Sequence, residues 1–201
     1  MATEDAAGKK VLVLVFKDFS RKHTITSLAQ ELDLSRVGIW KVLKKLETKG
    51  YVILDTIGSG KTSTSLIKVN WGNILVEKAV SLYLTEEAVK QRRWRVNFAE
   101  FENKVEFTIL FGSILHSPQQ ASDIDMLTVS KKSNFVNIQN IVEKVQKTQG
   151  KKVHIITFTA EEFKQELNRP NKVFIEAIKK GIILFGQEKF IQFMKRLSII
   201  Y

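Results

Sequence analysis

Residues 105–129 have the sequence VEFTILFGSILHSPQQASDIDMLTV, and this stretch decides the fold of the C-terminal half. Its first seven residues favour a β-strand, which ends directly at Gly112 and Ser113. After nine intervening residues, Asp123-Ile124-Asp125 opens a second apolar run. Because residues i and i+2 of a strand point to the same side, we expect the two carboxylates to lie together while Ile124 points into the core.

A strand, Gly-Ser, a short helix and loop, and Asp-x-Asp on the next strand resemble the nucleotidyltransferase superfamily that includes DNA polymerase beta. The stretch is most similar to the small prokaryotic minimal nucleotidyltransferases, over roughly residues 105–190. The resemblance implies that a nucleoside monophosphate passes from an NTP to an acceptor hydroxyl. It also implies that Asp123 and Asp125 hold Mg²⁺ or Mn²⁺, and that Gly112, Ser113 and the amides of the following helix bind the triphosphate. Taken alone, an Asp-x-Asp pair can equally cap a turn.

The third carboxylate that this family usually carries is missing from the expected strand, residues 152–156, where His154 stands at the matching position. A neutral imidazole can act as a base, but it binds Mg²⁺ poorly and supplies no negative charge. Two hypotheses therefore stay open. In one, His154 is catalytic together with Asp123 and Asp125. In the other, the domain is a nucleotide sensor or an antitoxin-like module without turnover.

The remaining pattern of this half indicates an α/β domain with a mixed sheet. Helical spacing predicts helices at 135–148, 173–178 and 187–197, and apolar runs predict strands at 153–158 and 182–185. Residues 159–162, TAEE, form a predicted capping box.

The first seventy residues have the element order of a winged helix-turn-helix. The spacing predicts a helix from Lys9 that includes Phe19, with residues 1–8 outside it, and then short helices at about 25–33 and 35–48. Alternating residues predict a hairpin of strands 51–54 and 65–69. The segments 25–35 and 40–52 closely resemble prokaryotic transcription regulators of this fold, which implies binding to double-stranded DNA.

The third helix presents the candidate DNA-binding residues. If Ile39, Leu43 and Leu46 face the core, the opposite face carries Arg36, Val37, Trp40, Lys41 and Lys44. Cationic side chains on such a face can reach phosphates, and Arg36 near the helix start is best placed for a base edge. Lys61 at the hairpin tip is a further candidate. The alternative is a solvated lysine-rich face on a domain that contacts only proteins.

Residues 58–62, GSGKT, are similar to the end of a phosphate-binding P-loop. That motif needs glycine where Asp55 stands and a helix after the lysine, whereas a β-branched strand follows here. We therefore interpret the segment as the turn of the wing.

The middle of the chain, residues 71–104, is expected to be a helical connector. We predict two helices with a break near Thr85-Glu86, the first with an apolar face of Leu75, Ala79, Leu82 and Tyr83. They could bridge the domains or form the seam of a homodimer. Arg92-Arg93-Trp94-Arg95 is interpreted as one exposed helix turn with the indole packed inward, rather than as a nucleic-acid patch.

Composition limits the class of protein. The chain has 201 residues, no cysteine, 44% hydrophobic residues and a net charge of +11. The excess is +5 in residues 1–70, from 12 basic and 7 acidic residues, and +5 in residues 105–201, from 14 basic and 9 acidic. This favours a cytoplasmic α+β protein without a membrane span. We expect three parts: winged helix (1–70), connector (71–104) and nucleotidyltransferase-like domain (105–201). DNA, an NTP and a protein or small-molecule acceptor are the expected partners.

Overall fold

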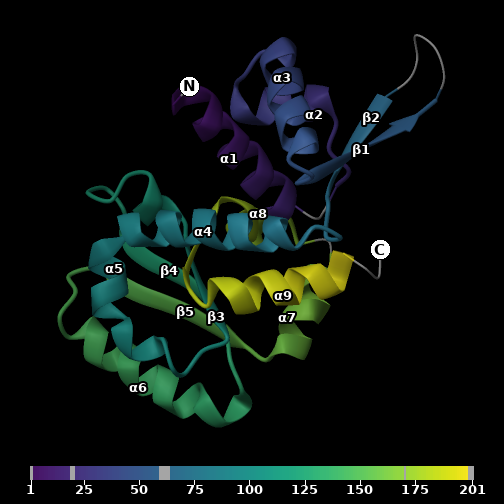
Figure 1. Cartoon of the computed structure of the whole chain (residues 1–201). Helices are drawn as coiled ribbons and strands as arrows, with labels where there is room; N and C mark the ends of the chain where they lie inside the picture. The colour runs from purple at the N-terminus through teal and green to yellow at the C-terminus, as the bar shows by residue number, and fades with distance from the viewer. Residues whose placement is uncertain (1, 19–20, 59–63, 170, 199–201) are drawn as a thin grey trace. The chain divides into compact units, whose positions relative to one another are not determined.

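The computed structural model describes residues 2–18, 21–58, 64–169 and 171–198. The chain forms two compact units, Met1–Tyr83 and Leu84–Tyr201, whose elements are labelled in Figure 1. The fold is α+β, with a two-stranded sheet in the first unit and a four-stranded sheet in the second. Among the described residues, no helix combines the length and the apolarity needed to cross a membrane.

The first unit is a winged helix-turn-helix. Its elements are α1 (Ala2–Lys17), α2 (Ile25–Leu32), α3 (Arg36–Thr48), β1 (Val52–Ile57) and β2 (Thr64–Val69). The two strands pair antiparallel, and the backbone N–H of Ile67 donates to the carbonyl of His23, which adds a short bridge at the edge of the hairpin. The hairpin tip with Lys61, and Phe19 after α1, lie outside the described residues.

Side chains define where the two middle helices of this unit begin. Thr24 and Ser27 form a reciprocal capping box at the start of α2. The Ser35 hydroxyl accepts a hydrogen bond of 3.0 Å from the backbone of Gly38 and so caps α3. The predicted core stripe of α3 is confirmed, because Ile39, Leu43 and Leu46 are all buried.

The first helix begins earlier than expected. The prediction that residues 1–8 lie outside it was wrong, since α1 starts at Ala2. Alanine loses the least side-chain entropy in a helix, and Ala6 and Ala7 extend the helix toward the chain start without needing to contribute large apolar surface.

The connector also departs from the prediction. Helix α4 runs without interruption over Ile74–Lys90, and the break falls at Gln91, before α5 (Arg92–Asn97) and the 3₁₀ turn η2 (Ala99–Phe101). The predicted break near Thr85-Glu86 was wrong. Neither residue removes a backbone N–H or has the freedom of glycine, so nothing there interrupts a helix that buries apolar surface on both sides of this point.

The buried stripe of α4 is not the predicted one. It consists of Val76, Val80, Leu84 and Ala88, all at 0% exposure. Leu75 and Leu82, which were expected to face inward, are exposed. The helix carries two apolar rows, and only packing decides which is buried. In α5 the prediction is confirmed: Trp94 is buried, and the guanidinium of Arg93 lies 4.7 Å from the centre of its ring.

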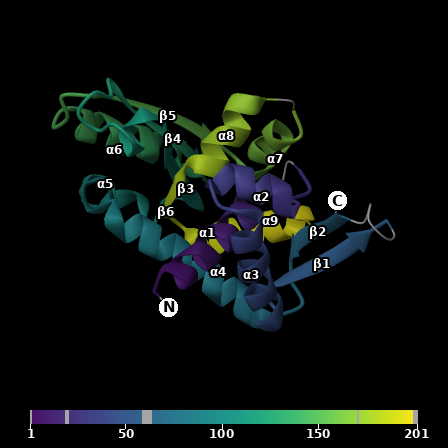
Figure 2. The ribbon, with the colours of Figure 1, turned by 90° about the horizontal axis from the view of Figure 1, so that it is seen from above.

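The second unit is built on a mixed sheet of strand order β5-β4-β3-β6, seen from another side in Figure 2. In chain order its elements are β3 (Phe107–Phe111), η3 (Ser113–Leu115), β4 (Asp123–Val129), η4 (Lys132–Asn134), α6 (Phe135–Gln146), β5 (Lys152–Phe158), α7 (Ala160–Leu167), α8 (Lys172–Lys180), β6 (Ile182–Phe185) and α9 (Gln187–Ser198). β3 pairs antiparallel with β4 and β6, and β4 pairs parallel with β5.

Two different cores cover the faces of this sheet. On one face, Ile124 and Met126 of β4 join residues of α5 and α6 in a largely aliphatic cluster. On the other, Phe107 of β3 makes edge-to-face contacts with Phe163 of α7 and Phe190 of α9, with ring centres 5.3 and 5.1 Å apart. Since strand residues alternate, Asp123 and Asp125 lie on this second face.

Candidate functional site

The two aspartates stand at the start of β4, where the strand reaches the edge of the second unit. Both are partly exposed, whereas Ile124 between them is fully buried, as the spacing predicts. The hydroxyl of Ser122 donates a 2.8 Å hydrogen bond to Oδ2 of Asp123. In the sheet, Asp125 is paired with Phe111 of the neighbouring strand β3 and with His154 of β5 on its other side.

His154 lies beside this pair. Its Nδ1 is 3.6 Å from Oδ1 of Asp125, and the two side chains are 44% and 31% exposed. Val153 belongs to the aliphatic core, so His154 must point to the opposite face, which it shares with Asp125. The structure therefore brings Asp125 and His154 together. At this distance they attract electrostatically when the imidazole is protonated, without a close hydrogen bond.

Gly112 fits against Asp125 in a way that no other residue can. Its φ is +84°, and a Cβ built on it would lie 2.7 Å from Oδ2 of Asp125. Both the backbone conformation and the space require glycine. The strand end of β3 and the carboxylate of β4 are therefore in van der Waals contact, and the backbone beside them is open to a ligand.

Ser113 begins η3, which is only three residues long. The short helix predicted after Gly-Ser, whose amides were expected to bind the triphosphate, is thus a single 3₁₀ turn without the dipole of a full helix. Pro118, which has no N–H to donate, and the polar residues around it do not extend the turn.

A cleft of about 500 Å³ opens next to Gly112, and two lysines are among its lining residues. It lies against α8 and is lined by Phe111, Gly112, Leu115, His116, Lys172, Val173, Glu176, Ala177 and Lys180. The ammonium of Lys180 is 2.7 Å from Oε2 of Glu176. The sequence analysis did not place these residues in the site, although Lys172, Glu176 and Lys180 are spaced to fall on one side of a helix and the segment 177–186 also resembles the tail of the nucleotidyltransferases.

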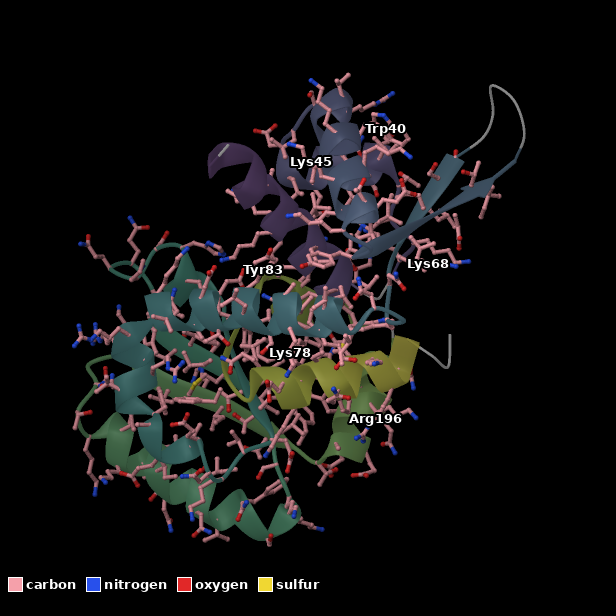
Figure 3. The ribbon with its side chains drawn as sticks, viewed as in Figure 1. Trp40, Lys45, Lys68, Lys78, Tyr83 and Arg196 are labelled. Atoms are coloured by element: carbon pink, nitrogen blue, oxygen red, sulfur yellow. The ribbon has the colours of Figure 1, made fainter. Side chains whose placement is uncertain are left out.

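In the first unit, α3 exposes the side chains chosen as DNA-binding candidates, Arg36, Trp40, Lys41 and Lys44. The ammonium of Lys44 lies 4.6 Å from the centre of the Trp40 ring and 2.8 Å from Oε2 of Glu47. Figure 3 shows Trp40 and Lys45 on this helix, and Lys45, which was not among the candidates, is exposed as well. Lys61 lies outside the described residues.

Comparison with protein families assigns both units. Residues 9–60 match the family described as HTH domain, and residues 96–190 match the family described as Polymerase beta, Nucleotidyltransferase. The chain is a fusion of these two domains. A comparison with curated proteins finds none that matches it.

In the nucleotidyltransferase domain, the donor set fits a divalent cation whose remaining coordination positions are taken by phosphate oxygens and water. Mg²⁺ is commonly held by one or two carboxylates together with substrate phosphates and water. Asp123 and Asp125 provide two carboxylates on one strand face, and Gly112, which lines the cleft, lies against the carboxylate of Asp125. The described residues contain no cluster of three or more acidic or histidine side chains that would hold a metal without a substrate.

Proposed function

We propose that this protein is a DNA-binding nucleotidyltransferase, which takes an NTP and transfers its NMP to the hydroxyl of a protein or small-molecule acceptor. The observation that carries the proposal is the contact between Gly112 and Asp125. It combines a carboxylate pair with a bare stretch of backbone at one edge of the sheet. Asp123 and Asp125 would hold Mg²⁺ or Mn²⁺, which supplies charge neutralisation at the phosphates.

The residues around the pair have separate roles in this proposal. Gly112 and Ser113 offer backbone and hydroxyl donors to the phosphates. The acceptor oxygen forms a bond to the α-phosphorus while the bond to the bridging oxygen breaks and pyrophosphate leaves. His154, 3.6 Å from Asp125, takes the proton of the acceptor hydroxyl, and the carboxylate stabilises the imidazolium that results.

The test is transfer of label from α-labelled NTPs, with Mg²⁺ or Mn²⁺ and a panel of acceptors, including the protein itself. We expect Asp123→Ala and Asp125→Ala to abolish transfer, and His154→Asp to raise the transfer supported by Mg²⁺ relative to Mn²⁺, because it restores a hard anionic ligand. Equal transfer by the wild type and both aspartate variants would refute the proposed site.

A second candidate function is a regulator whose nucleotidyltransferase-like domain acts as a nucleotide sensor or antitoxin-like module. The observation in its favour is His154, which replaces a negative charge by a neutral ring. Tight, metal-dependent NTP binding by the wild type, without label transfer to any acceptor, would favour this function over the first.

For the HTH domain we propose that α3 docks on double-stranded DNA, with Arg36 near a base edge and Lys41 and Lys44 on phosphates. The Trp40 ring holds the ammonium of Lys44 in place, which lowers the entropic cost of a phosphate contact, whereas Glu47 competes with the phosphate for this ammonium. Lys61, at the tip of the predicted hairpin, is proposed to reach the DNA backbone or the minor groove.

Binding to double-stranded DNA, titrated against salt, tests this surface. Replacing Lys41 and Lys44 by alanine removes two phosphate contacts. The slope of a plot of log K against log salt concentration should therefore become less negative by about 2. Lys147→Ala, an exposed lysine of the other unit, is the control. Unchanged affinity and slope in the double variant would exclude α3 as the docking surface.

A further inference from the structure

One edge of the four-stranded sheet gathers chemically distinct groups in a fixed order. β3 ends at this edge, and β4, β5 and β6 all begin there, since β4 and β6 are antiparallel to β3 and β5 is parallel to β4. Following the strand order from β5, the edge presents His154, then Asp125 with Asp123, then Gly112. The next strand is β6, which is preceded directly by Lys180 and Gly181.

The pairing of β3 with β6 brings Lys180 to the end of the sheet at which Gly112 lies. Lys180 is the last residue of α8, Gly181 joins it to β6, and Leu110 of β3 pairs with Ile182 at the start of β6. The tight packing of Gly181 supports this placement, because a Cβ there would lie 2.6 Å from Cγ2 of Ile109 and 3.0 Å from the carbonyl of Leu110. Lys180 and Gly112 also line the same cleft.

The surroundings of Lys180 suit an anion better than a neutral ligand. Its side chain is 62% exposed, and Lys180 can exchange its ion-pair partner Glu176 for a more highly charged anion. Phe111, Leu115 and Val173 give the cleft apolar walls, and the cations among its lining residues are Lys172 and Lys180.

We propose that Lys180 binds the β- and γ-phosphates of the nucleoside triphosphate in the cleft between Gly112 and α8. This inference rests on the proposed function, and it assigns an orientation to the bound nucleotide. The α-phosphate lies at Asp123 and Asp125, the pyrophosphate leaving group extends past Gly112 to Lys180, and the acceptor approaches from the side of His154. Lys180 stabilises the negative charge that accumulates on pyrophosphate as it leaves.

The ion pair between Lys180 and Glu176 makes the test specific. Glu176 also lies 3.7 Å from Nζ of Lys179. In a purely structural role these ion pairs would support α8, and replacing either Lys180 or Glu176 would weaken the helix. In the proposed role their effects on nucleotide binding are opposite, because Glu176 competes with phosphate for the ammonium.

The experiment measures, by calorimetry with Mg²⁺ present, the affinity of the full chain for the NTP that the wild type binds best and for the corresponding NMP. Lys180→Ala should weaken NTP binding about 5- to 10-fold, a moderate loss for an exposed cation, and leave NMP binding unchanged. Glu176→Gln should tighten NTP binding about 2- to 3-fold. Lys164→Ala, an exposed lysine of α7, is the matched control and should change neither.

The assignment of Lys180 would be overturned if Lys180→Ala bound NTP as tightly as the wild type does, or if it weakened the binding of NTP and NMP equally. Loss of affinity in both Lys180→Ala and Glu176→Gln would show a structural role instead. Thermal unfolding of each variant separates loss of binding from loss of fold. A wild type that binds no nucleotide at all would overturn the proposed function itself.

Discussion

Gly112→Ala is the sharpest single perturbation of the site, because it adds one methyl group where two separate constraints meet. The backbone at Gly112 has φ +84° and ψ −164°, a region almost reserved for glycine, so alanine costs about 1–3 kcal/mol of folding free energy. That corresponds to about a 5- to 150-fold shift in the unfolding equilibrium. The new Cβ would also lie 2.7 Å from Oδ2 of Asp125 and push the carboxylate away.

Two measurements separate these effects. Chemical denaturation gives the cost in stability, and calorimetry gives the affinity for NTP in the presence of Mg²⁺, which we expect to fall about 10- to 100-fold when the carboxylate is displaced. Gly150→Ala is the matched control, because a Cβ there meets no atom within 4 Å. If Gly112→Ala matched Gly150→Ala in nucleotide affinity, the contact between Gly112 and Asp125 would not shape the site.

Three further predictions concern stability. Leu43→Ala empties a fully buried position of the HTH domain and should destabilise it by about 2–5 kcal/mol in urea unfolding, whereas Val37→Ala on the exposed face should change stability by less than about 0.5 kcal/mol. Ser35→Ala removes the cap of α3 and should cost about 1 kcal/mol, read from the same urea curves. Hydrogen bonds from the backbone and then the side chain of Thr159 lower the pKa of Glu162 below its ordinary value. The stability that this adds is therefore present above the ordinary glutamate pKa and is lost as the pH falls through the lowered one. Unfolding free energies of the wild type and Glu162→Gln should converge in acid, and a difference that persists there would contradict this origin.

The sequence predicts the central part of the candidate site because that part is local. A strand ending in Gly112, followed by Asp123 and Asp125 two residues apart, fixes which groups share an edge through strand alternation alone. Lys180 is far from them in the sequence, and only the pairing of β3 with β6 brings it to the same edge. The spacing of Lys172, Glu176 and Lys180 puts them on one side of α8, but it does not say that this side faces Gly112.

The connector shows a different limit of sequence reasoning. The residues of α4 contain two apolar rows, one with Val76 and Val80, the other with Leu75 and Leu82, and both fit a helix. Periodicity does not say which row is buried, because burial depends on surfaces elsewhere in the fold. The length of the helix was underestimated for a related reason: a residue such as Thr85 has a small propensity cost, which apolar burial on either side easily exceeds.

The placement of the three tryptophans gives the fusion its own optical reporters. Trp94 lies in the aliphatic core of the second unit with 5% of its surface exposed, while Trp40 stands on α3 with 40% exposed. A buried indole emits at shorter wavelength than an exposed one, so loss of packing around Trp94 shifts its emission to the red. A ligand that covers Trp40 changes the intensity and the accessibility to quenchers of a separate, red-shifted component. Trp71 packs edge-on against Phe16 within the first unit. With Trp94→Phe and Trp40→Phe as references, unfolding of the nucleotidyltransferase domain and occupancy of the HTH surface can be followed side by side in one unlabelled sample.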